Sequence, residues 1–340
     1  MNTELVIVWR VTENCNLACP FCAYDRTLTR PRAAADPGQV LVFGEILHAE
    51  RLASGRSILV SWLGGEPFLW PALLEVAHIF KHKFDLRVAV TTNGLALKSA
   101  QTRERLAADF EQITISIDDL GPAHDRLRRA LGLFEGLRAN IQALSALTAR
   151  TGSRLLIRVN SVLMHSSLPA FESLCSQLAD WGVAELTFNS LGGRDRPAFF
   201  PANRLTRADA DWLCAELPRI RQQMQTRGLT IQGSRAYLER IAGLAQDDAY
   251  NVTDCAPGQQ FIFIDENGLA APCHFSVDGY GYPIGELSSR ADLQALPAIF
   301  LARQQRQQLA VCRDCRSTQV FGKFEVPAQD LTGVVYSFGK

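Results

Sequence analysis

Seven of the nine cysteines form two sets whose spacing is suited to metal binding, and these sets are Cys15, Cys19 and Cys22, then Cys255, Cys273, Cys312 and Cys315. Soft thiolate ligands select zinc or iron–sulfur clusters. A structural site normally takes four ligands, so a loop with three cysteines leaves one metal position open, as a catalytic site requires. The second set has four cysteines and can close a cluster completely.

The elements that position the first set read as repeated βα units. From Leu5 to about Met224 short β-rich runs alternate with longer runs of helical period, which is typical of a parallel sheet. The six predicted strands are Leu5–Thr12, Ser57–Leu63, Leu86–Thr92, Gln112–Asp118, Leu155–Leu163 and Ala184–Leu191, and most read as apolar on both faces. The three-cysteine loop therefore lies at the carboxyl end of a parallel strand, where barrel enzymes place their chemistry.

After Gly228 the alternation ends, and a second unit is expected. Residues 259–275 read as a hairpin that turns through Glu266-Asn267-Gly268, and a helix follows near residues 291–309, with Pro297 as a kink or restart. We therefore expect three parts, with a barrel at 1–228, a linker or helix at 229–250 and a metal-binding domain at 251–340.

Composition narrows the partner and the compartment. The chain has 340 residues, and 35 basic side chains balance 35 acidic ones, so its charge does not favour nucleic acid or a membrane surface. No apolar run is long enough to span a bilayer, and the N-terminus carries no basic-then-apolar signal. We expect a cytoplasmic protein that acts on a small molecule or a peptide.

The C-x3-C-x2-C spacing, with Phe21 before the last cysteine, resembles the motif of the radical S-adenosylmethionine (SAM) superfamily. The resemblance implies a partial (β/α)6 TIM-like barrel. It also implies a four-iron, four-sulfur (4Fe-4S) cluster that reductively cleaves SAM to a 5'-deoxyadenosyl radical, which abstracts hydrogen from a substrate. A flavodoxin or ferredoxin would be the low-potential electron donor. The alternative from the residues alone is a zinc loop or three incidental thiols.

Further motifs follow later strands. Gly64-Gly65-Glu66-Pro67 resembles the family's GGEP segment, whose glycines let the backbone approach the SAM ammonium, and Thr91-Thr92-Asn93-Gly94 and Ser116-Ile117-Asp118 are similar to its TNG and SxD segments. His124-Asp125 with Arg128 is similar to an HDxxR element, although an exposed helical arginine is the default interpretation. The fifth strand offers Arg158, Asn160 and Ser161 in place of the adenine-binding glycine motif. The cofactor contacts that the resemblance implies are Phe21, Gly64, Gly65, Glu66, Asn93, Ser116, Asp118, Arg128 and Asn160.

The second set resembles the twitch domain, a shortened SPASM domain in which a hairpin and a short helix hold one auxiliary 4Fe-4S cluster. A four-cysteine zinc ribbon is the alternative, and zinc would change the mechanism because it has no redox chemistry. A closed iron–sulfur cluster beside the barrel can accept one electron from a substrate radical. Oxidation is then the expected outcome.

The substrate is open at this stage. The cysteine layout resembles that of an anaerobic aminocyclitol dehydrogenase, and because the first strand starts at Leu5 we expect no leader-peptide-binding domain ahead of the barrel. Both observations favour dehydrogenation of a small polar metabolite. The alternatives are a maturase that crosslinks or epimerises ribosomal peptides and a non-catalytic iron–sulfur electron carrier.

Further predictions concern residues outside these motifs. Arg194, Asp195 and Arg196 follow the sixth strand and are the substrate-binding candidates, and a solvated ion pair of Arg194 with Asp195 is the alternative. Cys175 and Cys214 fall in helical patterns, and we expect buried thiols. Either could instead be the hydrogen donor of an epimerase. The histidines at 48, 78, 82 and 165 show no interpretable pairing with a carboxylate.

Overall fold

The strands of the protein form one curved sheet, which the computed structural model describes over residues 4–192 and 196–325. The strand order is β10-β9-β8-β1-β2-β3-β4-β5-β6-β7, and neighbours from β8 through β1 to β7 run parallel. The strands are β1 (Leu5–Thr12), β2 (Ile58–Gly64), β3 (Arg87–Thr92), β4 (Gln112–Ser116), β5 (Leu156–Leu163), β6 (Glu185–Ser190), β7 (Thr230–Ile231), β8 (Phe261–Ile264), β9 (Leu269–Ala271) and β10 (Tyr282–Pro283).

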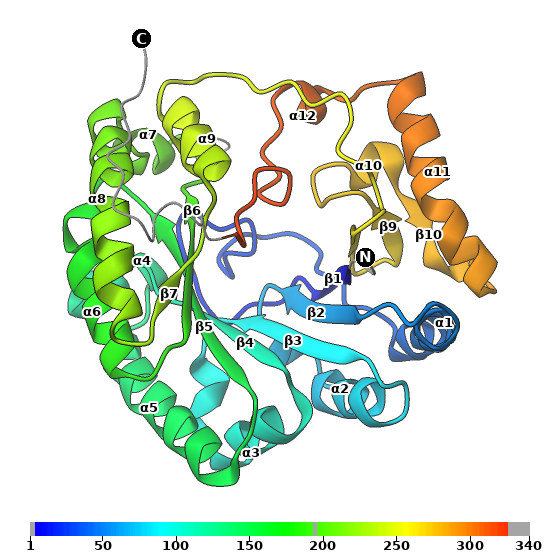
Figure 1. Cartoon of the computed structure of the whole chain (residues 1–340), viewed down its shortest axis with the longest axis horizontal. Coiled ribbons are helices and arrows are strands. Elements are labelled where there is room, and N and C mark those ends of the chain that lie inside the picture. The colour runs from blue at the N-terminus through cyan, green and yellow to red at the C-terminus, as the bar shows by residue number, and fades with distance from the viewer. Residues whose placement is uncertain (1–3, 193–195, 326–340) are drawn as a thin grey trace.

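The longer helices cover the outer face of this sheet, so that the strands surround a central space that is open on one side (Figure 1). The helices are α1 (Pro37–Ser54), α2 (Leu73–His82), α3 (Ala100–Asp109), α4 (Gly121–Arg128), α5 (Leu133–Thr151), α6 (Phe171–Asp180), α7 (Phe200–Asn203), α8 (Arg207–Gln225), α9 (Arg235–Ala245), α10 (Val277–Tyr280), α11 (Arg290–Arg306) and α12 (Ala310–Arg313). This is the mixed α/β fold of a partial TIM-like barrel, as the sequence predicted.

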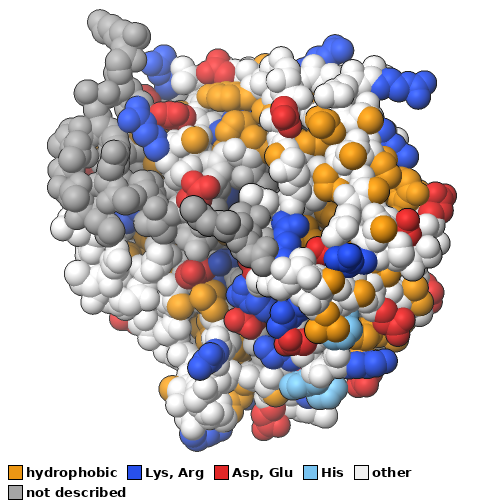
Figure 2. Space-filling view, turned by 45° about the vertical axis from the view of Figure 1, so that its right-hand side comes forward, with side chains coloured by type: hydrophobic (Ala, Val, Ile, Leu, Met, Phe, Trp, Pro, Cys, Tyr) orange, Lys and Arg blue, Asp and Glu red, His pale blue; other side chains and the backbone are white. Residues whose placement is uncertain are grey.

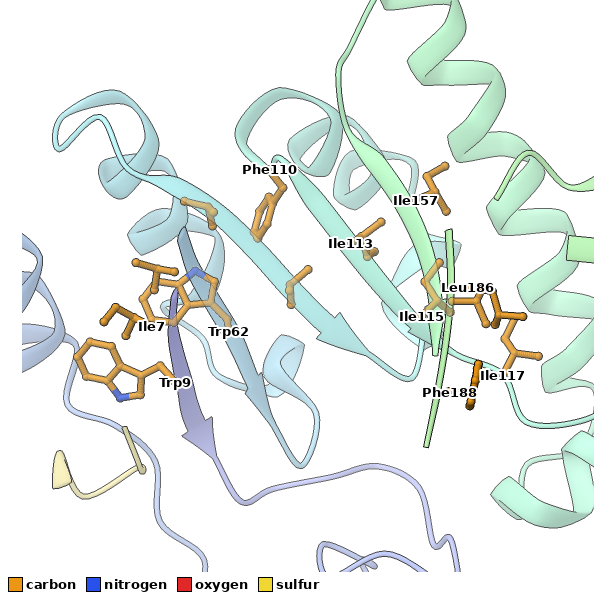
Figure 3. Packing of buried hydrophobic residues seen from close by; sticks show 14 of the residues in the cluster. Ile7, Trp9, Trp62, Phe110, Ile113, Ile115, Ile117, Ile157, Leu186 and Phe188 are labelled. Carbon is orange, nitrogen blue, oxygen red and sulfur yellow. The ribbon is translucent and has the colours of Figure 1, made fainter. Parts of the chain in front are cut away.

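The core lies between the sheet and the helices. Along β1 and β5 buried and half-buried residues alternate, and the buried ones face the helices. Trp9 and Trp62 are fully buried there, with ring centroids 5.8 Å apart, among the aliphatic side chains of neighbouring strands (Figure 3). The prediction that most strands are apolar on both faces is wrong, because the inward positions of these strands include polar side chains such as Arg158 and Asn160, which line a cavity.

The hairpin was predicted correctly, but its place in the sheet was not. Strands β8 and β9 form it, and Gly268 takes the left-handed conformation (φ 76°) at its turn. Strand β8 pairs in parallel with β1, and the short β7 adds a seventh parallel strand beside β6. The two residues of β7 are too few to show the alternation of a strand. The pairing of β8 with β1 joins segments far apart in the chain, which no local sequence pattern predicts. The boundary at residue 228 stays a prediction, since the sheet continues across it.

Helix α11 begins at a capping box, in which the hydroxyl of Ser289 accepts from the backbone amide of Asp292, whose carboxylate accepts from the amide of Ser289. Pro297 lies inside this helix. The helix therefore continues through the residue at which a kink or restart was expected. Helix α12 follows it in the chain and contains Cys312, which lines the same cavity as Cys273.

Candidate functional site

The first cysteine loop connects β1 to α1 at the carboxyl end of the strand, as predicted. Cys19 is buried, and Cys15 and Cys22 are half-buried. The backbone amide of Leu17 donates to Sγ of Cys15, and that of Tyr24 donates to Sγ of Cys22, both at 3.4 Å. Amide donors of this kind favour thiolate charge and help to set the potential of iron–sulfur clusters.

Burial makes the thiols of Cys15 and Cys19 reluctant to ionise alone. It raises the pKa of Cys15, and it raises the pKa of Cys19 to about 11, although the guanidinium of Arg128 opposes both shifts. The thiol form therefore dominates at neutral pH in the absence of a metal. Binding a metal here must displace these protons, so loading will be favoured by higher pH.

Sulfur spacing tests zinc against a larger cluster. Four thiolates at about 2.3 Å from a tetrahedral zinc lie about 3.8 Å from one another. Among the described residues, three ligand atoms all within 4.8 Å of each other occur only in a group without cysteine, so neither cysteine set is drawn together that closely. A multi-iron cluster is wider than a single ion. The thiolate donors are those that iron–sulfur clusters use, and a cluster at the second set stays a prediction.

Glu66 connects the ends of β2 and β3. Its carboxylate is buried, and it accepts from the hydroxyl of Thr92 at 2.7 Å and from the amides of Asn93 and Phe68 at 2.8 and 3.3 Å. Burial raises its pKa against these donors. The side-chain amide of Asn93 donates to Oδ1 of Asn16 in the cysteine loop at 2.8 Å. The two motifs thus brace the loop, and direct contact of Glu66 or Asn93 with SAM stays a prediction.

The two glycines of the same motif, Gly64 and Gly65, are required by backbone packing within the protein itself. A Cβ on Gly64 would lie 2.4 Å from the carbonyl oxygen of Thr12, and one on Gly65 would lie 2.3 Å from that of Asn14. The amide of Gly65 also donates to the Thr12 carbonyl at 2.7 Å. Both glycines therefore let β2 pack directly on the backbone that enters the cysteine loop.

Arg128 is buried, so the default expectation of an exposed helical arginine is wrong. Its Nη2 lies 2.6 Å from Oδ2 of Asp118, whose other oxygen accepts from the Val162 amide at 2.9 Å. The guanidinium stands 5.4 Å from the ring centre of Phe21. The side chains of Asp118 and Arg128 thus join β4, β5 and α4 beside the thiols. The Asp118 amide donates to Nδ1 of His124, which fixes that buried imidazole too.

Ser116 and Asn160 are register partners on β4 and β5, and both are half-buried. Oδ1 of Asn160 accepts from Nζ of Lys323 at 2.8 Å and from the hydroxyl of Thr187 at 3.1 Å. Sequence reasoning missed Lys323, which lies beyond the last cysteine and belongs to no motif. Burial lowers its pKa to about 7, with Arg158 adding to the shift. The SAM contacts expected of Ser116 and Asn160 stay predictions.

The third substrate candidate reaches the cysteine loop. Arg196 donates from Nη2 to the carbonyl oxygen of Cys22 at 2.9 Å. Arg194 and Asp195 lie outside the described residues. Of these three residues, only Arg196 is described by the structure, and it contacts the cysteine loop. Its role in substrate binding stays a prediction.

The barrel encloses a cavity of 1040 Å³ that touches both cysteine sets, since Cys22 and Cys273 both line it. Polar side chains make up much of its wall, and they are Arg10, Tyr24, Arg158, Asn160, Glu185 and Lys323. Residues 316–319, 321, 323 and 324 also line it. In Figure 1 the segment after α12, in red, lies between the β5–β7 side of the sheet and the β8–β9 hairpin. The C-terminal segment thus borders the same space as the cluster loops.

The four cysteines of the second set line one smaller cavity, of 490 Å³, and they are Cys255, Cys273, Cys312 and Cys315. Polar groups surround the sulfurs. Nε2 of Gln304 lies 3.9 Å from Sγ of Cys255, and the Tyr280 hydroxyl lies 4.0 Å from Sγ of Cys312. Burial raises the pKa of Cys255 to about 11 and also raises those of Cys312 and Cys315. The fold therefore brings together the four cysteines that were grouped from the sequence, although Cys255 and Cys315 are 60 positions apart.

Arg240 on α9 holds the loop of the last two cysteines, and sequence reasoning missed it. Its Nε and Nη2 donate to the Cys315 carbonyl at 3.0 and 2.7 Å, and Nη2 donates to Oδ1 of Asp314 at 3.1 Å. The guanidinium also stacks 4.3 Å from the ring centre of Tyr250. A full positive charge next to Cys315 stabilises negative charge on the sulfur. No local motif announces such a long-range contact.

Cys175 and Cys214 are buried in the hydrophobic core, as expected. Burial raises the pKa of Cys214 to about 11 and raises that of Cys175 further. Neither residue lines the cavity between the cysteine sets. The geometry thus gives no support to either thiol as a hydrogen donor to substrate.

Comparisons with known proteins agree with this site. The family model described as "Radical SAM superfamily" matches residues 9–164. An AdoMet-dependent heme synthase of Methanosarcina barkeri is 31% identical over 42% of this chain and 40% of its own length. A PqqA peptide cyclase of Xanthomonas campestris pv. campestris is 24% identical over 85% of this chain and 73% of its own. A pre-heme d1 synthase of Dinoroseobacter shibae is 24% identical over 56% of this chain and 46% of its own. The chain thus spans less than half of the length of each of these two synthases.

Solved structures share the fold. Streptococcus suis SuiB bound to S-adenosylmethionine superposes with a TM-score of 0.66 at 17% identity, over 94% of this chain and 72% of that one. Native anSMEcpe with bound AdoMet superposes with a TM-score of 0.62 at 14% identity, over 92% of this chain and 88% of that one. Both alignments extend past the barrel strands into the C-terminal unit, so these likenesses concern the fold of both parts.

Among the described helices, none has the length and apolar character needed to cross a membrane. On the face shown in Figure 2 basic and acidic side chains are interspersed, in agreement with the balanced composition. Members of the matched family use a 4Fe-4S cluster and SAM. The matched region contains the three-cysteine loop and the strand ends that brace it, so residues 9–164, a little under half of the chain, are similar to the radical SAM superfamily.

Proposed function

We propose that this protein is a radical SAM oxidoreductase with two 4Fe-4S clusters, which removes a hydrogen atom and then an electron from a small polar substrate held in the barrel, while a proton is released to solvent. One observation carries the proposal. The 1040 Å³ cavity is lined by one cysteine from each set, Cys22 and Cys273, so a molecule inside it lies between the two cluster sites.

The residues divide into two cluster sites and a binding wall. Cys15, Cys19 and Cys22 would hold the first cluster and leave one iron for SAM, and the four cysteines of the second set would hold the other. When bound, these groups supply the 5'-deoxyadenosyl radical that abstracts hydrogen and an acceptor for one electron. Arg128, paired with Asp118 beside the loop, offsets negative charge gathered by the thiolates.

The cavity wall favours a polar substrate. Its volume is at the upper end of the roughly 300–1,000 Å³ typical of small-molecule sites, and it must also admit part of SAM. Lys323 donates to Asn160 within it, and the ion pair of Arg158 with Glu185 forms another part of the wall. Hydroxyl, amino or carboxyl groups on a substrate could form further hydrogen bonds with these side chains, which an apolar substrate could not.

A second candidate is a peptide substrate, in which one residue enters the cavity. The likeness to a PqqA peptide cyclase over 85% of this chain favours it. SuiB bound to its precursor peptide SuiA also superposes, with a TM-score of 0.63 at 18% identity over 94% of this chain. In either case the electron donor of flavodoxin or ferredoxin type stays a prediction.

The test compares the anaerobically reconstituted enzyme with its Cys312→Ala variant, each with dithionite and SAM. Both proteins should release 5'-deoxyadenosine, because the first loop is intact in each. Candidate polar metabolites and peptides are then supplied, and only the wild type should form a product two hydrogens lighter. Absence of 5'-deoxyadenosine from the wild type would contradict the enzyme assignment, and equal oxidation by both proteins would contradict the role of the second cluster.

A further inference from the structure

His78, His82 and Asp109 converge on the outside of the barrel, although no carboxylate partner for these histidines could be identified from their spacing in the sequence. His78 and His82 are one helical turn apart on α2, so their imidazoles project from the same side. Asp109 is the last residue of α3. Nδ1 of His78 lies 3.0 Å, and Nε2 of His82 2.9 Å, from the same oxygen of Asp109. The helices thus bring Asp109 to two histidines that are 31 and 27 residues away in the chain.

The three groups have the chemistry of metal ligands. Their ligand atoms all lie within 4.8 Å of one another, the only such group among the described histidine, cysteine and acidic residues. Two imidazole nitrogens and a carboxylate oxygen are a recurrent zinc ligand set, with bonds of about 2.0–2.2 Å. A tetrahedral ion with such bonds needs ligand atoms about 3.3 Å apart, so small rotations of the exposed imidazoles suffice.

The carboxylate is held in place as a metal ligand requires. The side chain of Asp109 is 3% exposed, and its second oxygen accepts from Nε of Arg105 at 2.9 Å. Arg105 is itself fixed by donation from Nη2 to the Leu74 carbonyl at 3.0 Å. Outer contacts of this type orient ligands and are part of metal sites. The arginine binds the second oxygen and leaves Oδ1 to the two histidines, which a cation could bridge in place of their hydrogen bonds.

The histidine side of the cluster is open to solvent. The two imidazole ring centres are 4.4 Å apart, and the neutral imidazole nitrogen is the commonest metal ligand in proteins. The side chains of His78 and His82 are 47% and 51% exposed, so an ion can enter directly and keep a fourth position for water or another ligand.

We propose that His78, His82 and Asp109 form a zinc site on the outer surface of the barrel, separate from both cysteine sets and joining α2 to α3. This site is independent of the proposed oxidoreductase function, since none of its residues lines the barrel cavity. It would act as a staple between the two helices that flank β3, the strand that leads to Asn93.

The test is titration of the anaerobically reconstituted holoenzyme with Zn²⁺ alone, by calorimetry, so that the cysteines are occupied. We expect one equivalent to bind to the wild type. His82→Ala and Asp109→Asn should each weaken that binding at least tenfold. His48→Ala is the matched control, because His48 lies outside this cluster, with Nδ1 2.7 Å from the Phe84 carbonyl oxygen and its ring beside the Phe84 ring, and the variant should bind zinc like the wild type.

A second measurement, thermal melting with and without Zn²⁺, keeps the proposal testable if one of these variants folds poorly. Zn²⁺ should raise the melting temperature of the wild type and of His48→Ala, but not that of His78→Ala. Equal zinc stoichiometry and affinity in the wild type and in a His78→Ala/His82→Ala variant would overturn the proposal, and so would the lack of any zinc binding to the wild type. The three side chains would then be only a hydrogen-bonded surface cluster.

Discussion

Replacing Gly65 with alanine should remove the first cluster and spare the second. The added Cβ would lie 2.3 Å from the carbonyl oxygen of Asn14, 2.6 Å from its carbonyl carbon and 2.7 Å from the carbonyl oxygen of Glu13. Ordinary contact begins near 3.4 Å, so the backbone that leads into Cys15 must retreat by about 1 Å. These atoms belong to the main chain, and no side-chain rotation can relieve the contact.

A displacement of that size is large for a metal loop. A shift of about 1 Å in a reacting group can cost on the order of 100-fold in rate. We therefore expect Gly65→Ala to bind about four irons per chain in place of about eight, because the second set of four cysteines is untouched. Release of 5'-deoxyadenosine should fall by on the order of 100-fold or more.

Gly136→Ala is the matched control. Gly136 lies inside α5, and a Cβ there meets nothing within 4 Å. Alanine in the middle of a helix stabilises it by roughly 0.5–1 kcal/mol relative to glycine, so this variant should keep its iron and melt slightly higher. Iron and sulfide are counted anaerobically in all three proteins. Wild-type iron and 5'-deoxyadenosine in Gly65→Ala would refute the role assigned to the glycine.

Three further substitutions test other parts of the site. Cys312→Ala should lower the iron content from about eight to about four per chain, and an unchanged count would rule out the second cluster. Arg128→Gln leaves the buried Asp118 without its cation, so unfolding should become easier by about 3–5 kcal/mol in denaturant titrations, and a loss below about 1 kcal/mol would mean that the pair is dispensable. Lys323 has a folded pKa of about 7, below its ordinary 10.5, so it costs stability as pH falls from about 10 to about 7 and no more below that. The melting temperature of Lys323→Met relative to wild type should therefore be higher at pH 7 than at pH 10, and a pH-independent difference would contradict the shifted pKa.

The sequence predicted those parts of the molecule that depend on local pattern. All six barrel strands lie within two residues of their predicted ends, because their short length and β-rich composition set them apart from the longer runs of helical period between them. The turn at Gly268 and the two cysteine sets were predicted from residue types, glycine in a turn and clustered cysteines, that have few alternative explanations. The predicted function of the first loop rests on the same few residues.

The rest depends on contacts between distant segments. The parallel pairing of β8 with β1 and the donation from Arg240 to Cys315 join residues more than 70 positions apart. The polar inner face of β5 also escaped notice, since a strand that is buried on both sides is normally apolar, and this one borders a cavity. Lys323 enters that cavity from a segment that carries no motif.

The central claim is that Cys15, Cys19 and Cys22 hold a cluster with one iron left for SAM, and electron paramagnetic resonance of the reduced protein tests it most directly. In the Cys312→Ala variant, which retains only the first cluster, adding SAM should change the spectrum of that cluster, because SAM becomes a ligand of its open iron. A spectrum that stays the same at saturating SAM, or an iron-free protein that gives no spectrum, would contradict the account.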